Sequence, residues 1–355
     1  MHRTNRQSTV LRHAFTLVEL LVVISIIAVL AGILLTALSS ATESATRSQA
    51  EATLSSFAAA CDSFAQEHGR YPGVVPTRVL GDGSQLTSTQ NALLHMMGGY
   101  RVRTSDEPSS NPNTVEYDRF RDAARDPVEL TLQDPGNTDR TWEIVIDRTR
   151  ISEGPLIDGK PYPPYFAPKA SELVNRWLTA TEPDADQARR QGYNQLPDLY
   201  DPWGNPIIYL KRDRKGGPLV GDEDTRGQFS NQGIGLYVEA TALGTDRIRQ
   251  KQYEFSDSEA ISGSRIAGED GDGDAVEQRR WLTAVVAHPA FYQTEDWEFG
   301  TANGSFVLIS AGPDGVFLSH QDGPINTNGG YVQEWDDAEP NQIEDFDDLV
   351  RSGGG

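Results

Sequence analysis

A long and predominantly apolar run near the N-terminus dominates the pattern of hydrophobic and polar positions. It extends from Phe15 to Leu38, and its only ionisable side chain is Glu19. A helix of that length, rising about 1.5 Å per residue, is roughly 36 Å long, against a hydrocarbon core of roughly 30 Å. The run therefore predicts a membrane-spanning helix over residues 15–38.

Beyond this run the pattern becomes amphipathic. Residues on one helical face recur at steps of three and four: Leu54, Phe57, Cys61, Phe64 and His68. Gly69 is a natural C-terminal stop. We therefore expect residues 39–69 to continue the helix and to pack on a globular head. Cys61 and His68 lie seven residues apart on this face, a spacing that could also suggest a catalytic nucleophile and its base. Packing in the core is the favoured interpretation of both residues.

The remaining sequence predicts shorter elements that together make an α+β head with an antiparallel sheet. Two helices are expected, at Thr89–Met97 before Gly98 and at Glu172–Thr179 behind Ser171. Five strands are expected, at Trp142–Ile146, Ile207–Leu210, Leu236–Glu239, Trp281–Ala287 and Phe306–Ser310. The head is expected to cover residues 70–355, with an insertion at 212–300.

The charge balance of the chain is strongly acidic. Its 355 residues include 31 Lys and Arg and 52 Asp and Glu, for a net charge of −21. A surface of that sign repels phosphate backbones, so no nucleic-acid partner is expected. Cys61 is the single cysteine, which excludes an intramolecular disulfide.

The residues before the apolar run are basic. Arg3, Arg6, Arg12 and His13 occur there without an acidic residue. The positive-inside rule therefore places the N-terminus in the cytoplasm and the head outside. An ordinary secretory signal has its small-residue cleavage site after the apolar region. Here the small residue, Ala14, stands before it, so cleavage would leave the membrane segment on the mature chain.

The string A-F-T-L-V-E from Ala14 to Glu19 resembles the prepilin family, which includes type IV pilins and type II secretion pseudopilins. The resemblance implies that residues 1–14 are a leader, which prepilin peptidase cuts off between Ala14 and Phe15. It also implies that the new amine of Phe15 is methylated and that Glu19 is needed for assembly. The family usually has Gly where this chain has Ala14.

The position of Glu19 agrees with that role. An acidic side chain at the centre of a bilayer costs roughly 2.5 to 3.5 kcal/mol on insertion scales, so it needs a partner. The amine of Phe15 in a neighbouring subunit would supply one only in the assembled fibre. The alternative is an ordinary signal anchor that tolerates one carboxylate.

A second signature is the string D-P-W-G-N-P from Asp201 to Pro206, immediately before a predicted strand. Its prolines, glycine and asparagine predict a fixed turn. It resembles a segment of type II secretion major pseudopilins. We expect Trp203 to cover a sheet edge or the long helix; a sugar-binding tryptophan is the alternative.

A third signature follows the last predicted strand, where Ser310 leads into a turn that contains Asp314; Asp347 and Asp348 lie near the C-terminus. In the pseudopilin family a similar turn and an acidic terminal segment bracket a calcium-binding loop. The resemblance implies that Asp314, Asp347 and Asp348 are calcium ligands, supplemented by backbone carbonyls and water. The alternative is a solvated acidic tail.

Motifs for catalysis are missing from the sequence. It contains no H-E-x-x-H zinc pattern, no G-x-S-x-G elbow and no phosphate-binding G-x-x-x-x-G-K. We therefore expect a structural subunit and not an enzyme.

The sequence as a whole predicts a pilin-like subunit of a type II secretion pseudopilus or a related type IV pilus-like fibre. It would be a single-pass protein of the bacterial inner membrane with a periplasmic head. Its expected partners are further copies of itself, other pseudopilins, prepilin peptidase and the inner-membrane assembly platform. Two alternatives remain open: a minor type IV pilin whose head binds a ligand or surface, and a membrane-anchored enzyme.

Overall fold

The structure of the chain is a computed structural model. It describes residues 17–80, 86–174, 196–221, 225–231, 234, 237, 264–266, 275–291, 297–319, 322–323 and 338–354. The chain divides into two compact units, Met1–Ser48 and Gln49–Gly355, and the helix α1 (Leu17–His68) contributes to both.

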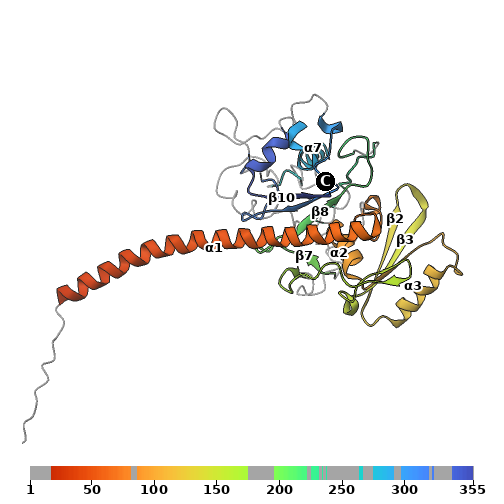
Figure 1. Ribbon diagram of the computed structural model, residues 1–355, viewed down its shortest axis with the longest axis horizontal. Coiled ribbons are helices and arrows are strands. Elements are labelled where there is room, and N and C mark those ends of the chain that lie inside the picture. The colour runs from red at the N-terminus through yellow and green to blue at the C-terminus, as the bar shows by residue number, and fades with distance from the viewer. Residues whose placement is uncertain are drawn as a thin grey trace, which may run out of the picture. The chain divides into compact units, whose positions relative to one another are not determined.

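Figure 1 draws the part of α1 in the first unit in red. Its side-chain surface is apolar and exposed. Its large apolar side chains range from 45% exposed at Val23 to 79% exposed at Leu17. Among the described residues, α1 is long and apolar enough to cross a membrane. Apolar side chains around the whole circumference are expected of a helix that faces lipid.

The part of α1 in the second unit buries one face. Its buried residues include the predicted stripe apart from His68, which is half-buried. They pack in one core cluster: Ala50, Leu54, Phe57, Cys61 and Phe64. The helix ends at His68, and the N–H of Gly69 donates to the carbonyl of Ala65 at 2.8 Å. Gly69 has a φ of 69°, which favours glycine at this stop. The predicted continuation and its end are confirmed.

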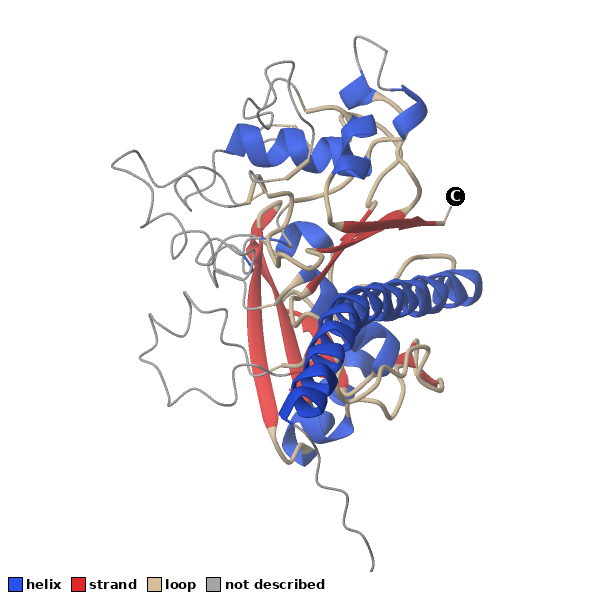
Figure 2. Ribbon diagram, turned by 90° about the vertical axis from the view of Figure 1, so that its left-hand side faces the viewer, coloured by secondary structure: helices blue, strands red, loops and turns tan. Residues whose placement is uncertain are grey.

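One antiparallel sheet has the strand order β10-β9-β8, formed by β8 (Ile207–Lys211), β9 (Phe306–Ser310) and β10 (Leu349–Gly353). Alternate side chains belong to different cores. One set shares a cluster with α1: Ile207, Tyr209, Phe306, Leu308 and Leu349. The other set shares a cluster with α7 (Ala275–Val286): Ile208, Leu210, Val307 and Ile309. The sheet is therefore buried on both faces (Figure 2).

A second antiparallel sheet has the order β1-β3-β2, formed by β1 (Tyr100–Thr104), β2 (Pro127–Asp134) and β3 (Asn137–Asp147). Val145 packs with Tyr117 and Phe120 of α3 (Pro112–Ala123). On the other face, Ile144 and Ile146 share a cluster with Leu94 of α2 (Ser88–Met97). This sheet therefore lies between two helices as well (Figure 1).

Short elements complete the described chain. The short strands are β4 (Leu156–Ile157), β5 (Lys160–Pro161), β6 (Leu173–Val174) and β7 (Asp198–Leu199). The 3-10 helices are η1 (Thr77–Val79), η2 (Arg148–Arg150), η5 (Pro289–Phe291), η6 (Trp297–Phe299) and η8 (Pro340–Asp345).

Several of the predicted elements are confirmed. The helix expected at Thr89–Met97 is α2, which has a capping box between Thr87 and Gln90 and ends before Gly98. The strands expected at Trp142–Ile146, Ile207–Leu210 and Phe306–Ser310 lie within β3, β8 and β9. Secondary-structure propensity and the neighbouring turn residues were sufficient to predict these segments.

Two predicted elements are wrong. Trp281–Ala287 was expected to be a strand, but α7 occupies it up to Val286. All side chains from 281 to 287 are buried, so the run has no polar face that could reveal a helical period. The helix expected at Glu172–Thr179 is replaced at its start by β6, where Leu173 pairs with Leu199.

The remaining parts of two predictions lie outside the described residues. These are the rest of the helix expected at Glu172–Thr179, from residue 175 onward, and the strand expected at Leu236–Glu239 apart from Tyr237.

Candidate functional site

The N-terminal motif and the described structure overlap only in part. Ala14 and Phe15 lie outside the described residues, whereas Glu19 lies within α1. Their predicted roles in processing and assembly therefore rest on the sequence.

The D-P-W-G-N-P turn is organised around the carboxylate of Asp201. The N–H of Asn205 donates to its Oδ1 at 2.8 Å, and the hydroxyl of Ser310 donates to its Oδ2 at 2.8 Å. Burial raises the pKa of Asp201, while these donors oppose that shift by stabilising the charged form. Trp203 is half-buried against the core cluster that contains Phe57 of α1, which agrees with its predicted packing role.

This turn is also joined to the turn after β9. The side-chain amide of Asn205 donates to the carbonyl of Gly312 at 3.3 Å. The adjoining strands pair in register, with Ile207 opposite Ser310. The second and third sequence signatures therefore form one hydrogen-bonded structure at the end of the β8–β9 pair.

Three carboxylates converge beside this structure: Asp314, Asp322 and Asp347 each offer an oxygen within 4.8 Å of the other two. Asp314 lies in the turn after β9, and Asp347 lies just before β10. Gly312 permits this approach, because it has a φ of 66° and a Cβ there would lie 2.6 Å from the carbonyl oxygen of Asp347. A side chain at position 312 would push the two turns apart.

The electrostatics of the three carboxylates favour a cation. Burial, followed by the hydrogen bond and negative charge of Asp347, raises the pKa of Asp322 to about 8. Oδ1 of Asp322 is buried and has no hydrogen-bond partner among the described residues. A divalent cation would relieve the repulsion and satisfy that oxygen, and hard carboxylate oxygens are ligands that Ca²⁺ prefers. The residues present therefore fit a calcium ion.

Asp348 lies outside this group of three. Its Oδ2 accepts a hydrogen bond from the N–H of Leu318 at 3.0 Å, and its side chain is buried. Burial, then the charge of Asp322, raises the pKa of Asp348. The fold thus brings Asp314 and Asp347 together, and adds Asp322 in place of Asp348. Asp322 precedes Gly323, a turn signal that carried no indication of a ligand.

Comparison with known proteins gives one match. A family model described as the prokaryotic N-terminal methylation motif matches residues 11–35. This match supports a protein of the prepilin or type IV pilin class. The matched residues include Ala14, Phe15 and Glu19 and extend into α1. No curated protein and no solved structure matches the chain.

A prepilin-class precursor is processed by prepilin peptidase and assembles into pilin-like fibres. The motif and the exposed apolar part of α1 fit a protein anchored in the inner membrane. The long helix and antiparallel sheets of this chain make a pilin-like α+β fold. The motif also favours a structural subunit.

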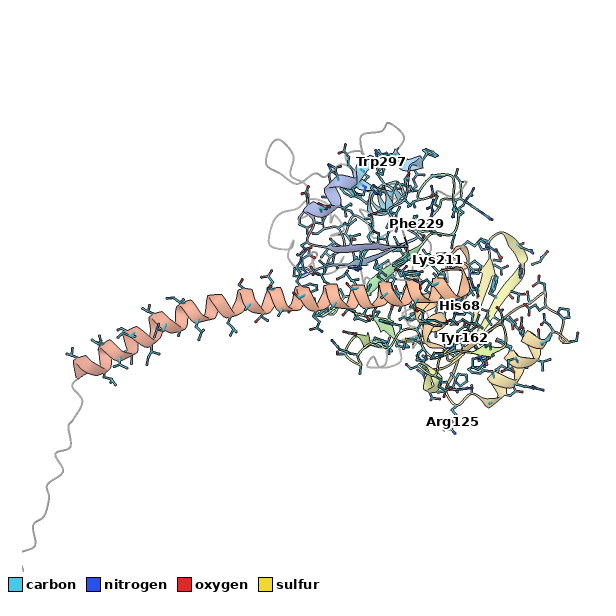
Figure 3. All side chains as sticks on the ribbon, viewed as in Figure 1. His68, Arg125, Tyr162, Lys211, Phe229 and Trp297 are labelled. Atoms are coloured by element: carbon cyan, nitrogen blue, oxygen red, sulfur yellow. The ribbon has the colours of Figure 1, made fainter. Side chains whose placement is uncertain are left out.

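Cys61 lies in the core of the head, and the half-buried His68 packs on residues at the edge of that core. Cys61 is fully buried, and burial raises its pKa, which disfavours the nucleophilic thiolate. Nε2 of His68 is 2.9 Å from the hydroxyl of Tyr165, and its ring packs on Tyr162 (Figure 3). The core-packing interpretation accounts for both residues.

Proposed function

We propose that the chain is a structural subunit of a type II secretion pseudopilus or a closely related type IV pilus-like fibre. The observation that carries this proposal is the methylation motif at residues 11–35, followed by the exposed apolar surface of α1. The D-P-W-G-N-P turn and its link to the turn after β9 favour the pseudopilin type.

In this proposal the basic leader stays in the cytoplasm and the head is periplasmic. Other pseudopilins and the inner-membrane assembly platform would be the partners of the mature chain. Glu19 would pair with the methylated amine of a neighbour, which aligns subunits along the fibre. In a single subunit in lipid, both the Glu19 carboxylate and the amine would lack a partner. Assembly brings the two charges of neighbouring subunits together, which favours the fibre.

We also propose that the head binds calcium through Asp314, Asp322 and Asp347. These side chains come from the turn after β9, the segment that follows it and the entry to β10. An ion there would join the turn after the central strand β9 to the entry of the edge strand β10. Its role would be to stabilise the head rather than to catalyse a reaction.

The second sheet favours one alternative, a minor pilin at the fibre tip. The β1-β3-β2 sheet and α3 enlarge the head beyond the sheet that packs on α1. Abundance of the protein along sheared fibres supports a major subunit, and presence only at fibre tips supports a minor one.

Mass spectrometry of the mature protein from its native membrane tests the class. The expected N-terminus is methylated Phe15, and Ala14→Leu should leave unprocessed precursor. Thr9→Leu, a similar change earlier in the leader, serves as the control and should be processed normally. A mature chain that still begins at Met1 would exclude the proposal.

A further inference from the structure

A cavity of about 930 Å³ lies in the head. The loop after α1, strands β1 and β3, and the segment that follows β8 all contribute to its lining. Lys211 and Phe229, both labelled in Figure 3, are lining residues. A cavity of that size is within the range of small-molecule sites, roughly 300 to 1,000 Å³.

The lining is basic although the chain is acidic. It includes seven cationic side chains: Arg70, Arg78, Arg103, Arg140, Lys211, Arg214 and Arg226. Its anionic side chains are Glu107 and Asp213. The described lining therefore has an excess of positive charge in a chain whose net charge is −21. Three acidic residues, 222–224, lie outside the described residues, and the excess belongs to the described lining.

Four of these cations already have carboxylate partners. Lys211 pairs with Asp213 at 3.6 Å and Arg78 with Asp134 at 3.0 Å. Arg103 pairs with Glu143 at 2.7 Å, and Arg140 with Asp106 at 3.3 Å. These pairs fix the walls and neutralise part of the charge.

The other three cations have no carboxylate partner among the described residues. Arg70, Arg214 and Arg226 are exposed and form no ion pair with any residue that the structure describes. Nη1 of Arg214 donates to the backbone carbonyl of Arg226 at 3.3 Å, which brings these two arginines together. A guanidinium presents a planar set of donors that matches the oxygens of a carboxylate or a phosphate.

Lys211 adds a positive charge that is largely withdrawn from water. Its side chain is 16% exposed, and a Cβ on Gly73 would lie 2.9 Å from its Nζ. Burial lowers the pKa of Lys211, with Asp213 opposing the shift. An ammonium group that is withdrawn from water is attracted more strongly to an incoming anion than one in open solvent, because water screens it less.

We propose that this cavity binds a small ligand that carries at least two oxyanion groups, with Arg214 and Arg226 holding one and Arg70 and Lys211 another. The ligand must be small, because the net negative charge of the chain repels extended polyanions. The site goes beyond the role in a fibre and does not depend on it.

Inorganic pyrophosphate, which carries two phosphoryl groups, is a suitable probe. The full chain in nonionic detergent is titrated by calorimetry in metal-free buffer, with sodium chloride at matched ionic strength as the reference. We expect one pyrophosphate per chain, and at least tenfold weaker binding by the double variant Arg214→Gln, Arg226→Gln. Both arginines are exposed, so the variant should fold, as its melting temperature will verify.

A charge-matched control distinguishes a site from general attraction. Arg119 and Arg125 are exposed and do not line the cavity (Arg125 is labelled in Figure 3). Arg119→Gln with Arg125→Gln should bind pyrophosphate within twofold of wild type. An equal loss in both double variants, or no binding by wild type, would overturn the proposal. Salt-sensitive association between copies of the chain, without pyrophosphate binding, would also overturn it and assign the arginines to a subunit contact.

Discussion

The hydroxyl of Ser310 donates a 2.8 Å hydrogen bond to Oδ2 of Asp201, across a separation of 109 residues. Both side chains are buried. The bond joins the turn before β8 to the end of β9, next to the residues that lead to Asp314. It therefore makes the position of the candidate calcium site depend on the D-P-W-G-N-P turn.

Removing this hydroxyl should destabilise the head. In Ser310→Ala, Oδ2 of Asp201 loses its 2.8 Å donor and keeps the longer contact with the Asn205 amide at 3.4 Å. The loss of a donor to a buried charged acceptor lowers the free energy of unfolding by about 1–3 kcal/mol. Urea unfolding of the full chain in nonionic detergent measures the loss. Ser109→Ala, at an exposed serine, should stay within about 0.5 kcal/mol of wild type. Equal effects of the two substitutions would contradict the role of the bond.

Calcium should raise the melting temperature of the full chain above its value in chelator. If calcium binds the folded state and not the unfolded state, it adds about 2.7 kcal/mol to the free energy of unfolding at a calcium concentration a hundredfold above Kd. Asp314→Ala and Asp322→Asn should each remove the difference, because each takes away a ligand of the three-carboxylate group. Asp345→Ala alters an exposed carboxylate nearby and should keep the difference. If wild type melts alike in both buffers, the acidic residues bind no calcium.

Asp198 should make the stability of the head fall as the pH rises from about 4 to about 7. Burial raises its pKa to about 7, although Tyr237 and Thr87 donate to it at 2.8 and 3.0 Å. In that pH range the folded chain holds a proton that the unfolded chain releases, so the stabilisation present in acid is lost through about pH 7. The largest change that this shift allows is about 4 kcal/mol.

Chemical unfolding at a series of pH values measures this effect as the difference between wild type and Asp198→Asn. That difference should decline between pH 4 and 8. Asp134→Asn is a control of opposite sign, because the hydrogen bonds from Arg78 help to lower the pKa of Asp134. The stabilisation of the folded head by ionised Asp134 is lost only as the pH falls below about 4. Parallel curves for wild type and Asp198→Asn would show that Asp198 titrates normally.

Replacing Glu19 should separate membrane insertion from assembly. In Glu19→Val the helix inserts at least as well as wild type, because no carboxylate enters the bilayer. Assembly should weaken, with at least a tenfold lower yield of sheared fibres, because the neighbour's amine loses its partner. Ser25→Val removes a polar but uncharged side chain from the same helix and should leave the yield unchanged. An unchanged yield with Glu19→Val would rule out the pairing.

Local patterns in the sequence were sufficient for much of the fold. The run from Phe15 to Leu38, the stripe that ends at His68 and the stop at Gly69 predicted α1. The turn at Asp201 to Pro206 predicted the start of β8. Each of these signals depends on a few adjacent residues, whose spacing and backbone preferences act before distant contacts form.

Other elements depended on tertiary contacts. β1 alternates arginines with other residues and was not predicted as a strand. In the fold, the guanidiniums of Arg101 and Arg103 stack on Phe120 and Tyr117 of α3, at 4.6 and 4.4 Å from the ring centres. The polar face of the strand is thereby covered, which a pattern of hydrophobic positions cannot reveal.

The sequence by itself determined the class of the protein, because the motif around Ala14, Phe15 and Glu19 is continuous along the chain. Only the tertiary structure placed Asp322 beside Asp314 and Asp347, and only it gathered arginines between residues 70 and 226 around one cavity. The physical reason is that a charge cluster is defined by distances through space. Asp314 and Asp347 come close because β9 pairs with β10, and the arginines come close because the loop after α1, β1, β3 and the segment after β8 line one cavity.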